Sequence, residues 1–203
     1  MKVSVLFSGG KDSSLAAIML GQFFDVELVT CNFGTLPTWH IARSVANELG
    51  FPHKVLKLDP QILQDATRLI VNEGFPKNGI KFIHWHALEY LASLPDIKTI
   101  ADGVRRDDRT PVLSTSEVMS IESRFNIQYI RPLEGYGRKT INVLVDMYFE
   151  IEEKKGDLMI GAEYEFELRE EIKNLYGEDK VLRIFPRDHT HSRVIKMRES
   201  KTS

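Results

Sequence analysis

Short apolar runs rich in β-branched residues alternate with longer segments of helical spacing along most of this sequence. In the longer segments, apolar residues recur every three or four positions, which gives each predicted helix one buried stripe. Strands that alternate with helices in this way favour a parallel sheet that is covered by helices on both faces. The predicted strands span residues 3–7, 26–33, 54–58, 99–104 and 127–133.

The fold class that follows is α/β, an open, twisted, Rossmann-like parallel sheet of about five strands. Ser114 and Glu117 have the spacing of a capping box, which predicts the start of a helix at this point. The apolar spacing predicts four further helices, over residues 39–49, 61–73, 80–92 and 141–151.

The α/β pattern weakens in the last quarter of the chain, so we divide it into a domain of residues 1–155 and an extension of residues 156–203. The extension begins with a charged helix over residues 163–176. Two strand-like runs, residues 181–185 and 192–196, are expected to pair with each other as a small extension of the fold. Polar residues of this extension can form a lid or a substrate-binding surface: Glu163, Tyr164, Glu165, Arg169, Arg187, His189 and Arg193.

The composition is that of one well-buried domain, for which 203 residues suffice. No apolar run approaches the ~20 residues that span a bilayer, and the first residues resemble a strand instead of a signal peptide. We therefore expect a cytoplasmic protein without membrane contact. Cys31 is the single cysteine, which leaves no disulfide and no thiolate cluster for zinc or iron–sulfur. The net charge of −2 gives no overall attraction to nucleic acid, although the last residues are basic.

The sequence Ser-Gly-Gly-Lys-Asp-Ser at residues 8–13 lies between a predicted strand and an apolar helical segment. Glycines in such a turn let the backbone approach a ligand, and the first N–H groups of the helix lack partners. That geometry binds phosphate, although an ordinary glycine-rich turn has the same appearance. A Walker loop is excluded, because Val5 replaces its first Gly and Asp12 follows the Lys where Ser or Thr is required. The dinucleotide fingerprint Gly-x-Gly-x-x-Gly is absent as well.

Two charged segments follow later strands, so they belong to the same edge of the sheet as the glycine turn. Residues 102–109 hold three carboxylates and three guanidinium groups, which suits a polyanion or a metal ion, or else a loop of internal ion pairs. Residues 131–140 place Lys139 at the start of a helix. A cation there opposes the helix dipole, which suggests a negative group nearby unless the lysine faces solvent.

The histidine spacing does not predict a metal site. His84 and His86 lie two positions apart on a predicted helix, so they point to different faces. His189 and His191 can share one face of an extended segment, but they lack further His or Cys partners. We expect a hydrogen bond or a substrate contact for that pair.

The pattern Ser-Gly-Gly-x-Asp-Ser resembles the loop of the PP-loop ATP pyrophosphatases, the adenine nucleotide alpha hydrolase-like superfamily. The resemblance covers residues 1–149 and implies Mg²⁺-dependent cleavage of ATP between its α and β phosphates. It implies that Asp12 binds the metal with Asp107 or Asp108, and that the end of the second strand holds the adenosine. The nucleotide-binding residues implied in this way are Ser8, Gly9, Gly10, Lys11, Asp12, Ser13, Cys31, Asn32, Phe33, Gly103 and Lys139.

The resemblance also implies a two-step reaction. A carbonyl or carboxylate oxygen of the acceptor attacks the α-phosphorus and pyrophosphate leaves, after which a nitrogen or, less favoured, a sulfur nucleophile displaces AMP. In such an AMP-forming ligase the catalytic residues are Asp12, Lys11 and Lys139, which position the metal and neutralise phosphate charge. We expect ATP and one further acceptor as ligands, an ammonia- or sulfur-donating partner protein, and a homo-oligomer.

Two other functions remain open. The first is a nucleotide sensor that binds ATP or AMP without turnover, although binding alone does not need a carboxylate that orients a metal. The second is tRNA modification, including thiolation, in which the basic tail contacts tRNA. The single Cys31 lowers the expectation of thiolation, because sulfur transfer in the superfamily often uses paired cysteines.

Overall fold

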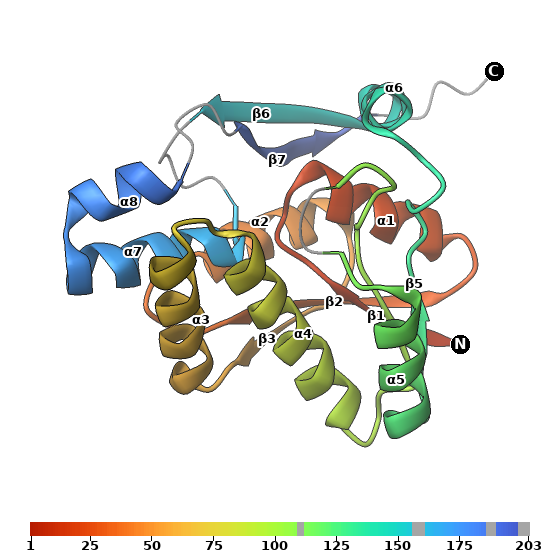
Figure 1. The fold of residues 1–203 in the computed structure, drawn as a ribbon. Coiled ribbons are helices and arrows are strands. Elements are labelled where there is room, and N and C mark those ends of the chain that lie inside the picture. The colour runs from red at the N-terminus through yellow and green to blue at the C-terminus, as the bar shows by residue number, and fades with distance from the viewer. Residues whose placement is uncertain (109–111, 156–160, 186–189, 199–203) are drawn as a thin grey trace.

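The computed structural model describes residues 1–108, 112–155, 161–185 and 190–198. Strands and helices alternate through the first two thirds of the chain, as Figure 1 shows. The elements of the main sheet and its crossovers are β1 (Lys2–Leu6), α1 (Lys11–Gly21), β2 (Asp25–Asn32), α2 (Trp39–Leu49), β3 (His53–Lys57), α3 (Pro60–Glu73), α4 (Lys77–Ser93), β4 (Thr99–Ala101), α5 (Thr115–Phe125) and β5 (Gln128–Ile130). They are followed by α6 (Arg138–Tyr148), β6 (Phe149–Lys155), α7 (Tyr164–Tyr176), α8 (Glu178–Ile184) and β7 (Thr190–Met197).

The predicted α/β fold is confirmed. The main sheet has five strands in the order β3-β2-β1-β4-β5, and every neighbouring pair is parallel. Strands β6 and β7 form a separate two-stranded antiparallel sheet. The predicted helix over residues 39–49 is confirmed, and both hydrogen bonds of the Ser114 capping box are present at the start of α5.

Helices cover both faces of the main sheet (Figure 1). On one face, α3, α4, α5, α7 and α8 enclose a core that contains the buried side chains of Ile83 and Leu88. On the other face, α1, α2, α6 and the β6–β7 sheet enclose a second core around Val5 and Leu15. Apolar burial of this extent is the main stabilising contribution to such a fold. Within the described residues, no helix is both long and apolar enough to cross a membrane.

The expected strand pair of the extension is wrong. Residues 181–184 belong to the end of α8, with Phe185 as its C-cap, because Val181, Ile184 and Phe185 have three- and four-residue spacing and are all buried. The partner of β7 is instead β6, and the helix expected to continue to residue 151 ends at Tyr148. The short run over residues 181–185 fits a strand as well as a helix, so its spacing alone could not decide.

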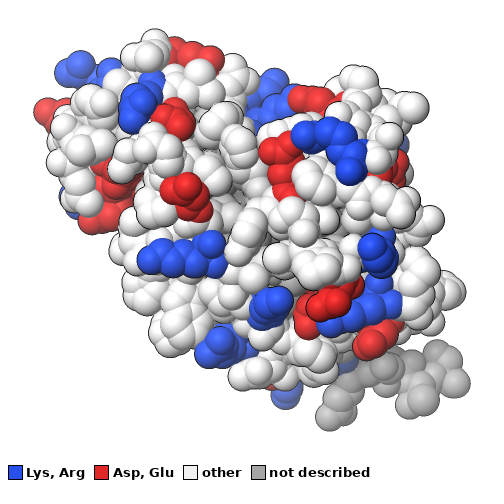
Figure 2. Space-filling model, turned by 90° about the horizontal axis from the view of Figure 1, so that it is seen from below, with Lys and Arg blue, Asp and Glu red and all other residues white. Residues whose placement is uncertain are grey.

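Charge on the described surface is mixed. The face seen in Figure 2 carries Lys and Arg side chains interspersed with Asp and Glu, without one extended basic area. This agrees with the small net charge of the chain.

Candidate functional site

The glycine loop, residues 8–13, follows β1 at the carboxyl edge of the main sheet. The neighbouring strand β4 is followed by a second loop, residues 102–108. Because β1 connects forward to β2 on one side while β4 lies on the other, the strand order reverses between these two loops. Parallel α/β sheets bind their ligands at such a switch point.

One left-handed glycine and two serine hydroxyls set the backbone conformation of the glycine loop, beside the crevice between the two loops. Gly9 has a φ of +80°, a conformation that L side chains rarely adopt. The Ser8 hydroxyl accepts a hydrogen bond from the Gly10 N–H at 3.3 Å, and the Ser13 hydroxyl donates to the Gly10 carbonyl at 3.1 Å. Helix α1 then begins without a side-chain cap. Its first N–H groups therefore offer the partial positive charge that binds anions.

Gly103 packs directly against the first turn of α1. A Cβ built on Gly103 would lie 2.7 Å from the Ser13 nitrogen and 2.8 Å from the Asp12 carbonyl carbon. Both neighbours are backbone atoms that no side-chain rotation can move. The predicted site residue Gly103 thus brings the loop after β4 into contact with the glycine loop.

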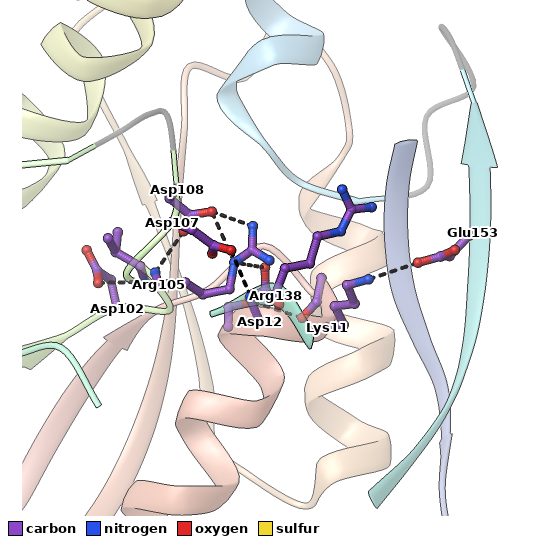
Figure 3. Close-up of polar contacts among 11 residues, drawn as sticks. Lys11, Asp12, Asp102, Arg105, Asp107, Asp108, Arg138 and Glu153 are labelled. Carbon is purple, nitrogen blue, oxygen red and sulfur yellow. Dashed lines mark hydrogen bonds and ion pairs between the residues drawn. The ribbon is translucent and has the colours of Figure 1, made fainter. Parts of the chain in front are cut away.

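Arg105 lies at the centre of the charged groups in the crevice (Figure 3). Its Nε is 3.2 Å from Asp12 Oδ2 and donates to Asp108 Oδ1 at 3.0 Å. Burial raises the pKa of Asp12 to about 6, an increase that the Arg105 charge partly opposes. The Arg105–Asp108 pair is an internal ion pair of the kind expected as an alternative for residues 102–109, whereas the Arg105–Asp12 pair joins the two loops.

Asp107 reaches a different helix. Its Oδ2 accepts a hydrogen bond from the Arg138 N–H at 2.8 Å, at the start of α6. This carboxylate lies at the positive end of the α6 dipole, but it contacts the backbone of Arg138 and not the Lys139 side chain. The predicted residue Lys139 is exposed on the next position of α6.

The C-terminal segment lies over the glycine loop. The Ala162 N–H donates to the Ser8 carbonyl at 2.9 Å, and the Val194 N–H donates to the Gly9 carbonyl at 3.2 Å. Lys11 Nζ forms an ion pair with Glu153 Oε1 of β6 at 2.9 Å, which Figure 3 shows beside the loop. The cation expected to neutralise phosphate is therefore bound to a carboxylate of this chain.

Glu163 approaches the loop from the same segment. A Cβ built on Gly10 would lie 3.5 Å from Glu163 Oε1, and Oε2 is buried without a hydrogen-bond partner among the described residues. Burial raises the pKa of Glu163 to about 8, so this carboxyl carries a proton at neutral pH.

The end of β2, where the resemblance places the adenosine, is occupied by α7. The Phe33 N–H donates to both oxygens of Glu167 at 3.1 Å, and the Thr35 N–H donates to Oε1 at 3.1 Å. Cys31 is buried in the core, where desolvation raises the pKa of its thiol to about 12. Asn32 Nδ2 is buried and has no hydrogen-bond partner in the described part of the chain, so it can donate to a ligand.

Asp102 fixes the start of the loop after β4. It is buried, and its Oδ1 accepts from the Val104 N–H at 3.0 Å. Its Oδ2 contacts His84 Nε2 at 2.9 Å and accepts from the Tyr129 hydroxyl. The Asp102 carboxylate is therefore held by its own loop, by α4 and by β5. His84 is buried on α4 and is a hydrogen-bond partner of Asp102, whereas His86 takes no part in this contact.

A divalent cation fits part of this donor set. Asp12 Oδ1 is buried and lacks a hydrogen-bond partner among the described residues, which suits a cation that also binds phosphate oxygens. Asp107 and Asp108 are engaged by Arg138 and Arg105 instead. In the described ranges, no group of at least three His, Cys, Asp or Glu side chains is arranged to hold a metal.

The sequence predicted both loops, but it did not predict the side chains that bind to them. Arg105, Glu153 and Glu167 were not among the predicted site residues, although each binds a group of the crevice. Only the density of charge in residues 102–109 indicated Arg105 in advance. His189, Arg187 and Arg109 lie outside the described residues.

The fold and the loop at its switch point define an α/β protein with a Rossmann-like parallel sheet. The chain belongs to the family described as "Family of unknown function (DUF7411)", which matches residues 1–196. The Methanocaldococcus jannaschii protein "Uncharacterized protein MJ0690" is 42% identical over 200 residues, 98% of each chain.

Two solved structures are similar to different degrees. The Methanocaldococcus jannaschii structure described as "predicted subunit of tRNA methyltransferase" is 41% identical, with 98% of this chain and 99% of that chain covered and a TM-score of 0.90. The U34-tRNA thiolase NcsA from Methanococcus maripaludis is 15% identical, with 72% of this chain and 56% of that chain covered. Its TM-score of 0.41 is too low to establish a common fold.

Proposed function

We propose that this chain binds ATP at the glycine loop and cleaves it between the α and β phosphates to adenylate a carbonyl oxygen of a tRNA nucleotide. The observation that carries the proposal is the contact between Gly103 and the uncapped first turn of α1 at the switch point. The uncapped turn leaves N–H groups at the edge of the sheet where a phosphate chain binds. The Ser-Gly-Gly-x-Asp-Ser pattern supports the PP-loop assignment.

The choice of acceptor draws on the 41% identical structure, which is described as a predicted subunit of a tRNA methyltransferase. A tRNA base supplies the carbonyl oxygen that this chemistry needs. We therefore place tRNA modification ahead of amidation of a small acid. The nucleophile of the second step is an amine or ammonia in preference to sulfur, because Cys31 is buried and its raised pKa keeps the thiol protonated.

In the proposed reaction, the carbonyl oxygen forms a bond to the α-phosphorus while the bond from that phosphorus to the bridging oxygen breaks. Pyrophosphate leaves with the bridging oxygen, and the nitrogen nucleophile later attacks the carbonyl carbon and releases AMP. The loop N–H groups and the Ser8 and Ser13 hydroxyls hold the departing pyrophosphate. Lys11 and Lys139 supply positive charge.

Mg²⁺ would be held by Asp12 through its unpartnered Oδ1 together with phosphate oxygens. Bound there, it would lower the negative charge of the phosphate chain. Asp107 and Asp108 would join it only after giving up their contacts to Arg138 and Arg105.

The test measures pyrophosphate release from ATP and Mg²⁺ with unmodified bulk tRNA. The wild-type chain should release pyrophosphate only when tRNA is present, and Asp12→Asn should not. Release of orthophosphate in place of pyrophosphate would refute the proposed cleavage site.

A second candidate function is a nucleotide-binding subunit without turnover. The observation that favours it is that Lys11 is paired with Glu153 and the Phe33 N–H with Glu167. ATP binding without any pyrophosphate release, in the presence of tRNA, would select this second function.

A further inference from the structure

Three planar side chains meet at the start of α2. The Trp39 and His40 rings stack with centroids 3.4 Å apart and an interplanar angle of 28°. The Arg43 guanidinium lies over the same Trp39 ring, 4.5 Å from its centroid. His40 and Arg43 are exposed and Trp39 is partly exposed. Because both groups lie against the Trp39 ring, the planar surfaces that face solvent are those of the imidazole and the guanidinium.

A further cation, Lys57, lies beside the segment that leads into α2. Lys57, at the end of the edge strand β3, is exposed, and a Cβ built on Gly34 would lie 3.4 Å from its Cε. Burial and then the Arg43 charge lower the pKa of the nearby His53 to about 4. Among the described residues, no carboxylate is found paired with Arg43 or Lys57, whereas Arg105 binds two and Arg124 binds one.

The position of this group relates it to the glycine loop. Residues 33–38 lead from the end of β2 into α2, so Trp39 follows the carboxyl edge of the main sheet. Strand β2 is the direct neighbour of β1, from which the glycine loop departs. The end of β2 lies between the two places and is covered by α7, so only a molecule long enough to pass α7 can contact both.

We propose that Trp39, His40, Arg43 and Lys57 form a docking surface for unpaired nucleotides of an RNA. Bases stack on aromatic rings and on guanidinium planes, and lysine and arginine bind the phosphates between them. An acidic protein surface would use the cations but would leave the exposed His40 ring without a matching group. The inference rests on the proposed function, since it names the surface by which the tRNA acceptor is held.

The test compares the affinity of bulk tRNA for the wild-type chain with that for Trp39→Ala, Arg43→Gln and Lys57→Gln, each over a range of salt. Trp39→Ala removes the ring against which His40 and Arg43 lie, so the loss of one base stacked on them predicts about 5- to 150-fold weaker binding. Lys57→Gln should reduce the slope of log affinity against log salt by about one. Trp39→Phe retains a ring and should bind more tightly than Trp39→Ala.

Arg124→Gln is the matched control. Arg124 lies over the Trp85 ring at 5.6 Å, as Arg43 does over Trp39, but it is already paired with Glu89 at 2.6 Å. This variant should bind tRNA as the wild type does. Circular dichroism and ATP affinity, measured for all variants, show whether the fold and the glycine loop are intact.

The possible outcomes are distinct. Weaker tRNA binding by Trp39→Ala and Arg43→Gln, with Arg124→Gln and ATP affinity unchanged, supports the docking surface. If the wild type binds tRNA and the two folded variants bind it equally well, the surface is wrong while the proposed function stands. If the wild type binds ATP but no tRNA at about 50 mM salt, both the tRNA acceptor and this surface are refuted.

Discussion

Replacing Gly103 with alanine should separate the two loops of the candidate site. The φ of Gly103 lies outside the left-handed region, so alanine is allowed by the local backbone and only its surroundings oppose it. The new Cβ would lie 2.7 Å from the Ser13 nitrogen, against a comfortable contact of about 3.5 Å. Because the atoms in contact are backbone, the loop after β4 and the start of α1 must move apart by about 0.8 Å.

Overpacking of this kind costs about 1–3 kcal/mol, which is about 0.5–1.5 M in the urea midpoint for a slope near 2 kcal/mol/M. The displaced first turn of α1 should also weaken ATP binding. Gly135→Ala is the control, because a Cβ built there meets nothing within 4 Å and its φ is not left-handed. Alanine at that position should stabilise the chain by about 0.4–1 kcal/mol and leave ATP binding unchanged. Equal urea midpoints and equal ATP affinities for the two variants would refute the reasoning.

Three further substitutions test single groups of the site. Asp12→Asn should reduce pyrophosphate release by at least about 100-fold. It should not lower the urea midpoint, because Arg105 retains its contact with Asp108. A normal turnover rate would show that Asp12 is not a site residue. Glu153→Gln releases Lys11 and should tighten ATP binding about 1.5- to 5-fold in a calorimetric titration, whereas looser binding would mean that the pair holds Lys11 in place. Glu163→Gln tests the raised pKa of about 8: the folded state retains a proton that the unfolded state releases, so the wild-type free energy of unfolding falls as pH rises from about 4.5 to 8. The variant should lack that decline between pH 6.5 and 8, a range chosen because it lies above the ordinary pKa of a histidine side chain. Parallel curves of unfolding free energy against pH for variant and wild type would contradict the raised pKa of Glu163.

The main sheet could be predicted from the sequence because its signals are local. Each crossover repeats an apolar run and a helical stripe, and the Ser114 capping box names a helix start within four residues. The glycine loop could be located for the same reason. Its position at a switch point depends on the strand order, which the structure supplies.

Contacts between distant segments could not be predicted in this way. Glu167 is 134 positions from Phe33, and no spacing indicates that its carboxylate binds the Phe33 N–H. The pairing of β6 with β7 likewise joins polar strands whose pattern does not distinguish one partner from another. Tertiary packing therefore decides which groups cover the glycine loop.

The most direct test of the account is a structure of the chain with Mg²⁺ and an ATP analogue whose α–β bridge cannot be hydrolysed. The account predicts phosphate oxygens within hydrogen-bond distance of the N–H groups of residues 9–13, with Asp12 at the metal and Glu153 separated from Lys11. A nucleotide bound elsewhere, with the Lys11–Glu153 ion pair intact and the glycine loop free of phosphate, would contradict it.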